Sequence, residues 1–118
     1  MKTKKRYTIK ERKLLKKKAW VVFARYIRER DGKCVTCGNK EHLAAGHYCH
    51  KREDFNERNI HAQCYACNRC RKGNMRVYTM YMIDLYGIDS VRKLMECEKE
   101  KPRLESGEFY LAIMKKYC

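Results

Sequence analysis

The sequence predicts a helix-rich α+β fold in one domain of 118 residues. Helical periodicity is present at both ends of the chain, whereas the middle is rich in cysteine and histidine and lacks long apolar periodicity. No linker is long enough to divide the chain, and this length is ordinary for one domain. We therefore expect a basic N-terminal helix within residues 1–32, a central core at 33–74 and a helical C-terminal part at 75–118.

The N-terminal helix should run from about Glu11 to Arg30, after a frayed basic segment at residues 1–10. Asp31 and Gly32 should end it, because glycine readily takes the left-handed conformation that follows a last helical turn. The residues expected on its buried side are Leu15, Ala19, Val22, Tyr26 and Ile27, flanked by Trp20 and Phe23, which we also assign to the core.

The C-terminal part should contain three helical segments. Gly87 should stop the first, Asp89 or Ser90 should cap the second, and Pro102 should break it. The third should cover about residues 107–117. The positions expected to face inward are Val77, Tyr81 and Leu85 in the first segment, Val91, Leu94 and Met95 in the second, and Phe109, Ala112 and Ile113 in the third.

Positive charge is concentrated at the start of the chain. Lysine and arginine number 29 against 14 aspartate and glutamate, a net charge of +15, and residues 1–30 hold 13 basic and 2 acidic side chains. Such an excess repels itself unless it meets a polyanion, and nucleic acid is the usual one. The alternatives are a solvated surface or an acidic lipid. The charge therefore favours a nucleic-acid partner.

The eight cysteines indicate metal binding rather than a disulfide scaffold. The longest apolar run near the N-terminus, Ala19 to Ala24, is too short for a signal-peptide core, and no stretch could span a membrane. We therefore expect an intracellular protein with reduced thiols and no membrane association, in which paired cysteines bind metal.

Two C-x-x-C units, Cys34/Cys37 and Cys64/Cys67, are separated by 26 residues. Each can aim two thiolates at one point, and two such turns complete the tetrahedral shell that Zn²⁺ prefers. Cys67 and Cys70 form an overlapping C-x-x-C, so the second pair is ambiguous from spacing alone. A four-cysteine site has no open position, so this zinc should be structural.

The segment between and after these pairs has the composition of a hydrolytic site. It should form short strands around residues 43–49 and a short helix from about Cys64 to Lys72, closed by Gly73. Histidines beside amide side chains suit metal-assisted phosphodiester hydrolysis, which needs a base active near neutral pH and a divalent ion on the phosphate. Taken alone, each of these histidines is more often structural than catalytic.

The order of residues resembles the HNH (ββα-metal) endonuclease core. A histidine at 47 is followed by Asn59, five residues before a C-x-x-C, and by Asn68 directly after its second cysteine. The fuller string is more specific: A-G-H-Y at 45–48, F-N-E-R-N-I-H-A-Q-C-Y-A-C-N at 55–68, then G-N at 73–74. It is similar to the phage lambda NinG (Rap) family of recombination endonucleases, over about residues 33–95.

The resemblance implies a zinc-stapled ββα-metal core with a hairpin bearing His47, a loop bearing Asn59 and a helix bearing Asn68. His47 corresponds to the general base that activates water, and Asn59 to a brace that orients it. Asn68 corresponds to a ligand of a catalytic Mg²⁺ or Mn²⁺. The same correspondence selects Cys64 and Cys67 as the zinc pair. The remaining cysteines, Cys49, Cys70, Cys97 and Cys118, then become free thiols.

One position departs from the family pattern. Many HNH enzymes carry a metal-binding aspartate immediately before the first histidine, and this chain has Gly46 there. Glycine has no side chain to ligate, so another residue must help. The resemblance favours His61 as the substitute, with His50 and Asp54 as further candidates.

Basic residues around the implied site should contact DNA phosphates. They are Lys51 and Arg52 after the hairpin, Arg69, Arg71 and Lys72 beside Asn68, and Lys16, Lys17 and Lys18 in the N-terminal basic run.

The sequence is therefore interpreted as a DNA endonuclease acting on duplex or branched recombination intermediates in the host cytoplasm. Cutting both strands of a junction would favour a homodimer. A non-catalytic zinc-ribbon DNA-binding or recombination accessory protein fits the charge and zinc spacing equally well, and an RNA-binding protein shares the charge. The His47–Asn59–Asn68 constellation distinguishes the nuclease from both.

Overall fold

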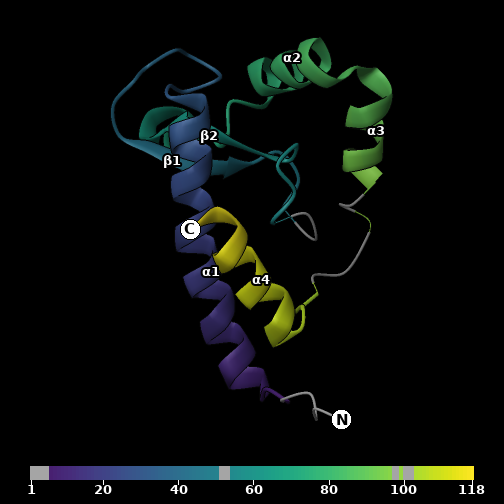
Figure 1. Cartoon of the computed structure of the whole chain (residues 1–118). Coiled ribbons are helices and arrows are strands. Elements are labelled where there is room, and N and C mark those ends of the chain that lie inside the picture. Colours follow the sequence, from purple (N-terminus) through teal and green to yellow (C-terminus); the bar gives the residue numbers. More distant parts are fainter. Residues whose placement is uncertain (1–5, 51–53, 97–98, 100–102) are drawn as a thin grey trace.

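The two strands of the fold lie between two groups of helices (Figure 1). The computed structural model describes residues 6–50, 54–96, 99 and 103–118. Their elements are α1 (Ile9–Asp31), β1 (Leu43–His47), β2 (Ile60–Cys64), the π-helix η1 (Ala66–Cys70), α2 (Met75–Tyr86), α3 (Ile88–Glu96) and α4 (Gly107–Tyr117).

Helix α1 begins earlier than the sequence indicated because it has a full capping box. The Thr8 side chain accepts from the Glu11 backbone N–H, and the Glu11 carboxylate accepts from the Thr8 N–H. The expectation that residues 8–10 fray is therefore wrong. At the other end, Gly32 has φ 69° and its N–H donates to the Arg28 carbonyl, as expected for a helix that ends in a left-handed glycine.

Strands β1 and β2 pair antiparallel, with Gly46 opposite His61 and His47 opposite Ile60. Side chains of directly opposed residues lie on the same face of a sheet, and neighbours alternate. His47 and Ile60 therefore share one face, and Gly46 and His61 share the other. Gly46 and His47, although adjacent in sequence, therefore lie on opposite faces of the sheet.

Helix α1 covers the His47 face of the sheet, and α4 packs along α1. Phe23, Ile27 and Ile60 are fully buried in this core. Helix α4 runs in the same direction as α1 along its side (Figure 1), and Arg12 of α1 donates to the Leu104 and Glu105 carbonyls just before α4 begins. The buried stripe of α1 is Ala19, Phe23, Ala24 and Ile27, while Leu15, Val22 and Tyr26 are only half-buried.

Helices α2 and α3 build a second core against the other face. The residues buried there include Tyr48, Cys49, Tyr78, Met82, Val91 and Leu94. Val91 and Leu94 were expected, whereas Met95 of the same helix is exposed. Val77 and Leu85 are also exposed, because the buried residues of α2 are Tyr78 and Met82, each one position after an expected one. Gly87 ends α2 as predicted, whereas α3 already begins at Ile88, so neither Asp89 nor Ser90 caps it.

Two further expectations need correction. Cys64 ends β2 rather than starting a helix, and the short helix is the π-helix at Ala66–Cys70, followed by Gly73 at φ 90°. The bounds of α4 match the expected 107–117, but its buried residues are Gly107 and Tyr110 rather than Phe109 and Ala112. Pro102 and Cys97 lie outside the described residues. Among the described helices, none is long and apolar enough to cross a membrane.

Candidate zinc centre and candidate active site

The four predicted zinc ligands come together at one end of the sheet. Their Sγ atoms all lie within 4.8 Å of one another, with Cys37 Sγ and Cys64 Sγ 3.5 Å apart. A tetrahedral zinc with Zn–S bonds of about 2.3 Å separates its sulfurs by about 3.8 Å, so this cluster fits Zn²⁺ closely. Cys70 is exposed and Cys49 is buried in the α2–α3 core, and neither joins the cluster. The choice of Cys64 and Cys67 is the one that the geometry supports.

Polar groups around the cluster stabilise the thiolates of two of its members, Cys34 and Cys67. At Cys37 the Asn39 N–H lowers the pKa, but hydrogen bonds with the other cysteines outweigh it and raise that pKa to about 12. Burial raises the pKa of Cys34, but hydrogen bonds from Thr36 and from backbone N–H groups outweigh it and lower that pKa to about 6. Arg71 and Asn74 donate to Cys67 Sγ at 3.6 and 3.7 Å. A thiol held as a thiolate is a better metal ligand, so the surroundings suit the four-cysteine site.

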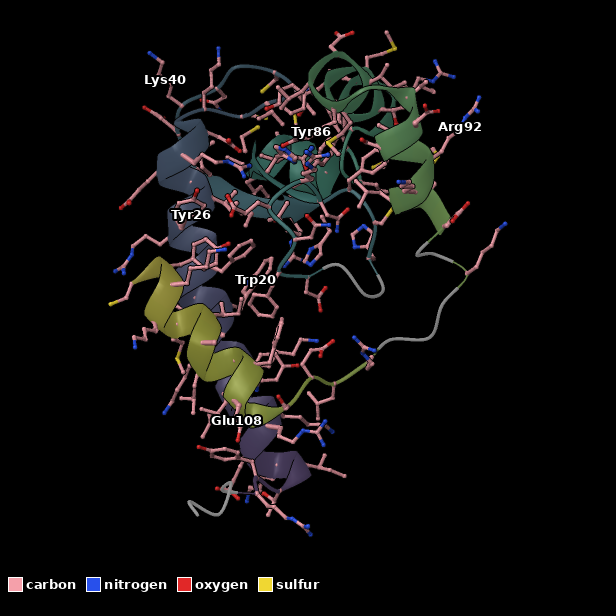
Figure 2. The ribbon with its side chains drawn as sticks, turned by 45° about the vertical axis from the view of Figure 1, so that its right-hand side comes forward. Trp20, Tyr26, Lys40, Tyr86, Arg92 and Glu108 are labelled. Carbon is pink, nitrogen blue, oxygen red and sulfur yellow. The ribbon has the colours of Figure 1, made fainter. Side chains whose placement is uncertain are left out.

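His47 lies at the end of β1 with its ring held from two sides. Its Nε2 is 3.0 Å from Asp54 Oδ1, and the indole of Trp20 stacks on the imidazole with centroids 4.9 Å apart. Figure 2 shows Trp20 projecting from α1 toward this region. Asp54 Oδ2 also forms an ion pair with Lys16 Nζ at 3.0 Å. Burial raises the pKa of Asp54, but its bonds to His47 and Lys16 outweigh burial and lower it, so the carboxylate stays ionised.

Asn59 is fully buried and ties down the backbone that follows His47. Its Oδ1 accepts from the Cys49 N–H and its Nδ2 donates to the Cys49 carbonyl, both at 2.8 Å. The Asn59 carbonyl accepts from the Tyr48 N–H at 2.9 Å. This is the geometry of a brace rather than of a metal ligand, and it matches the role that the family resemblance implies.

Asn68 faces His47 across a surface pocket. The pocket has a volume of about 330 Å³ and is lined by Ala45, His47, His50, Asn68 and Arg69. His50 is exposed, and its ring stacks on that of His47 at 5.5 Å. The structure thus brings the predicted base and the predicted ligand into one open site, although they are 21 positions apart in the sequence.

Gly46 cannot be replaced by a larger residue without a rearrangement. A β-carbon at this position would overlap the Gln63 Oε1 atom and would lie 3.2 Å from Asn68 Oδ1. Gln63 is fully buried, and its Oε1 has no hydrogen-bond partner among the residues that the structure describes. The space of the missing aspartate is thus filled by another side chain, whose oxygen lies beside Asn68.

The expectation that His61 replaces this aspartate is corrected by the structure. His61 lies on the opposite face from His47 and is fully buried. Tyr78 donates to the Gly46 carbonyl at 2.9 Å, so its oxygen accepts from His61 Nδ1 at 3.0 Å, and His61 Nε2 accepts from Tyr86 at 2.9 Å. Burial lowers the pKa of His61 to about 4, which keeps it neutral. Both nitrogens are engaged and none is left for a metal ion.

The predicted DNA-contacting residues fall into three groups. Lys51 and Arg52 lie outside the described residues. Lys16 is engaged by Asp54 and Arg71 lies on Cys67, so both have local partners. Arg71 is nevertheless exposed, as are Lys17 and Lys18 on α1 and Arg69 and Lys72 around η1.

Sequence reasoning missed three residues of this site. Trp20 was assigned only to the core and Asp54 only to a metal-binding role, whereas both hold His47. Gln63 was not considered, although it lies two residues after His61 and, by strand alternation, on the same face as Gly46. That signal becomes visible only when β2 is recognised as a strand.

The family profile described as Bacteriophage Lambda NinG protein matches residues 1–117. Protein ninG of Salmonella phage P22 is 34% identical over 87 residues, which cover 69% of this chain and 42% of that protein. Protein ninG of Escherichia phage lambda is 37% identical over 73 residues, covering 57% of this chain and 36% of that protein. The chain thus spans about two fifths of the length of these relatives or less. No solved structure matches it.

The family predicted from the A-G-H-Y and F-N-E-R-N-I-H-A-Q-C-Y-A-C-N strings is therefore confirmed over nearly the whole chain. Because the profile covers residues 1–117, it also includes the N-terminal and final helices, which the resemblance had left out. The chain belongs to the phage lambda NinG protein family.

Proposed function

We propose that the chain is a metal-dependent DNA endonuclease of the HNH type, with branched recombination intermediates as its candidate substrate. The observation that carries the proposal is the pairing of His47 with Asp54 at the edge of a pocket that Asn68 also lines. A zinc-bound DNA-binding module needs neither a histidine oriented by a carboxylate nor an amide ligand facing it.

His47 has the surroundings of a general base. The Asp54 carboxylate bonds Nε2 and therefore favours the tautomer in which Nε2 carries the proton. That tautomer leaves Nδ1 with its lone pair available to accept a proton from a water molecule. The negative charge on Asp54 stabilises the imidazolium that results, and the stacked Trp20 ring limits rotation of the imidazole.

Asn68 would hold the catalytic divalent ion, Mg²⁺ or Mn²⁺, at the pocket. Carboxamide oxygens suit such hard cations, and the unpartnered Gln63 Oε1, which occupies the side-chain space of Gly46, provides a second one close to Asn68 Oδ1. When bound, the ion would polarise the scissile phosphate and stabilise the leaving oxygen. Arg69, exposed at the rim of the pocket, would bind the adjacent phosphate.

The net charge of +15 supplies affinity for the DNA backbone without sequence preference. Zinc bound by the four cysteines would fix η1, which carries Asn68, against the end of β2. The site is thus held by metal on one side and by the α1 helix on the other.

The test is a cleavage assay on linear duplex and four-way junction DNA with Mg²⁺ or Mn²⁺, using zinc-loaded protein. The wild type should cut and His47→Ala should not, while both bind DNA equally in the absence of the divalent ion. His42→Asn is the matched control, because His42 is exposed at a positive φ of 54° that asparagine tolerates. Binding without cutting by the wild type would instead favour the accessory DNA-binding protein, and a preference for RNA would favour the RNA-binding one.

A further inference from the structure

We propose that Gln63 is a ligand of the catalytic divalent cation and takes the place of the carboxylate that many HNH enzymes carry where this chain has Gly46. The inference rests on the proposed nuclease function, because it names a second protein ligand for the same ion. It follows from one orphaned atom, one missing side chain and the position of Asn68.

The orphaned atom is Gln63 Oε1. The Gln63 amide orientation is fixed by its nitrogen, which donates to the Gly73 carbonyl at 2.7 Å and more weakly to Thr36 Oγ1 at 3.4 Å. The oxygen therefore points the other way, into the protein, and it is buried without a hydrogen-bond partner among the described residues. Buried carbonyl oxygens are nearly always satisfied in native proteins, by a protein group, a water molecule or an ion.

The missing side chain is that of residue 46. A β-carbon there would collide with Gln63 Oε1 and would lie 3.2 Å from Asn68 Oδ1, so both oxygens border the space above Gly46. Because Gly46 has no side chain, the Gln63 Oε1 atom can lie in the space that a side chain at position 46 would occupy. Asn68 borders this space and also lines the pocket that contains His47.

Other candidates for the second ligand are excluded by their contacts. His61 shares the Gly46 face with Gln63, but both of its nitrogens are bonded to tyrosines. Both carboxylate oxygens of Asp54 are engaged, one by His47 and one by Lys16. Among the described side chains that border the Gly46 space, Gln63 therefore offers the oxygen without a competing partner.

Two uncharged amide oxygens have a chemical consequence. Mg²⁺ and Mn²⁺ accept carbonyl oxygens, but without a carboxylate the protein contributes no negative charge to the site. Binding to the free protein should therefore be weak and should tighten when DNA phosphate joins the coordination shell. This differs from a site with an aspartate at position 46, whose affinity would depend less on DNA.

The first experiment locates the ion in the wild-type protein. Zinc-loaded protein is titrated with Mn²⁺. Among the first-row divalent transition metals, Mn²⁺ binds protein ligands with the lowest affinity, so it will not displace zinc from thiolates. Paramagnetic broadening of NMR signals should begin at the Gln63 and Asn68 side-chain amides and at the Gly46 N–H. Broadening that affects other residues but spares Gln63 would overturn the assignment. Because the measurement uses the wild-type protein, it does not depend on whether a variant folds.

The second experiment moves the ligand. Gln63→Ala should weaken Mn²⁺ binding at least tenfold while zinc content is retained, and Gly46→Asp combined with Gln63→Ala should restore it, because aspartate then has room. Gly46→Asp alone should not bind more tightly, since Gln63 occupies the space that its side chain needs. A folded Gln63→Ala protein with wild-type Mn²⁺ affinity would refute the proposal.

Failure of this inference and failure of the nuclease proposal give different results. DNA cleavage by a wild type in which Mn²⁺ spares Gln63 would overturn the ligand assignment and leave the nuclease standing. Mn²⁺ bound at Gln63 and Asn68 without any cleavage would support the ion site and overturn the nuclease.

Discussion

His47 Nε2 and Asp54 Oδ1 lie 3.0 Å apart, although Asp54 follows the end of β1 by seven residues. The carboxylate both orients the imidazole and balances the charge that it would acquire as a base. From the sequence, Asp54 was expected at most to bind metal; within the proposed nuclease, this contact makes it a positioning residue instead.

Asp54→Asn should lower the rate of DNA cleavage roughly 10- to 100-fold, in the range found when a partner that orients a functional histidine is lost. The amide keeps the shape of the side chain but removes its negative charge, so the imidazolium is no longer stabilised. Single-turnover rates at saturating DNA measure this directly, and DNA affinity without divalent metal should change little. Asp84→Asn, at an exposed position on α2, is the control. A wild-type rate in Asp54→Asn would show that the contact has no catalytic role.

Removal of one zinc ligand should unfold the central region. Cys34→Ala should lose stoichiometric zinc and most of the cooperative thermal transition, because zinc binding contributes directly to folding free energy. Cys70→Ala should retain both, since Cys70 is exposed and outside the cluster. Native mass spectrometry and circular dichroism melting report the two properties. Retained zinc and an unchanged melting temperature in Cys34→Ala would show that the ligand set is wrong.

Because of Glu57, the free energy of unfolding should decrease as the pH becomes acidic. It accepts from Tyr26 of α1 at 2.9 Å and from Tyr117 of α4 at 2.8 Å, and Tyr26 lies where these two helices meet (Figure 2). Burial raises the pKa of Glu57, but the hydrogen bonds from Tyr117 and Tyr26 outweigh it and lower that pKa below its usual 4.5. A lowered acid pKa adds stability that is complete above about pH 4.5 and is lost as the pH falls further.

Glu57→Gln should therefore be less stable than the wild type at pH 7 and should approach it below pH 4. The difference should stay under about 1 kcal/mol, because a partly exposed charge is screened by water. Urea unfolding of both proteins across pH 3–7 gives the comparison. A difference that does not change with pH would assign the effect to packing rather than to the charge.

Two of the lysines of α1 should contribute to DNA affinity and a third to the cleavage rate. Lys17 and Lys18 are exposed, so replacing both with alanine should weaken DNA binding and reduce the slope of log affinity against log salt by about two. Their loss should leave the cleavage rate at saturating DNA unchanged. Lys16→Ala should lower that rate, because Lys16 pairs with Asp54 behind His47. Fluorescence anisotropy at several salt concentrations checks the binding part, and an unchanged slope in the double variant would contradict it.

The sequence by itself determined the features that depend on local chemistry. Helix α1 ends at Gly32 and α2 at Gly87 because glycine adopts a left-handed or otherwise unusual conformation without a steric penalty. The C-x-x-C spacing predicts a four-cysteine metal site, although spacing alone left the second pair ambiguous between Cys64/Cys67 and Cys67/Cys70. The long string from Phe55 to Asn68 was enough to predict the family.

Only the tertiary structure decided how the site is assembled. Strand β2 has the sequence I-H-A-Q-C, which alternates apolar and polar residues, but all five are buried. The polar side chains of His61 and Gln63 therefore face protein rather than solvent, and the alternation alone could not show this. The pairing register places His61 and Gln63 on the same face as Gly46. Tyr78 and Tyr86 of α2 engage both nitrogens of His61, whereas Gln63 Oε1 lies against Gly46. Contacts such as His47 with Asp54 and Trp20 arise from the packing of α1 on the sheet, which depends on residues distant in sequence and leaves no local pattern.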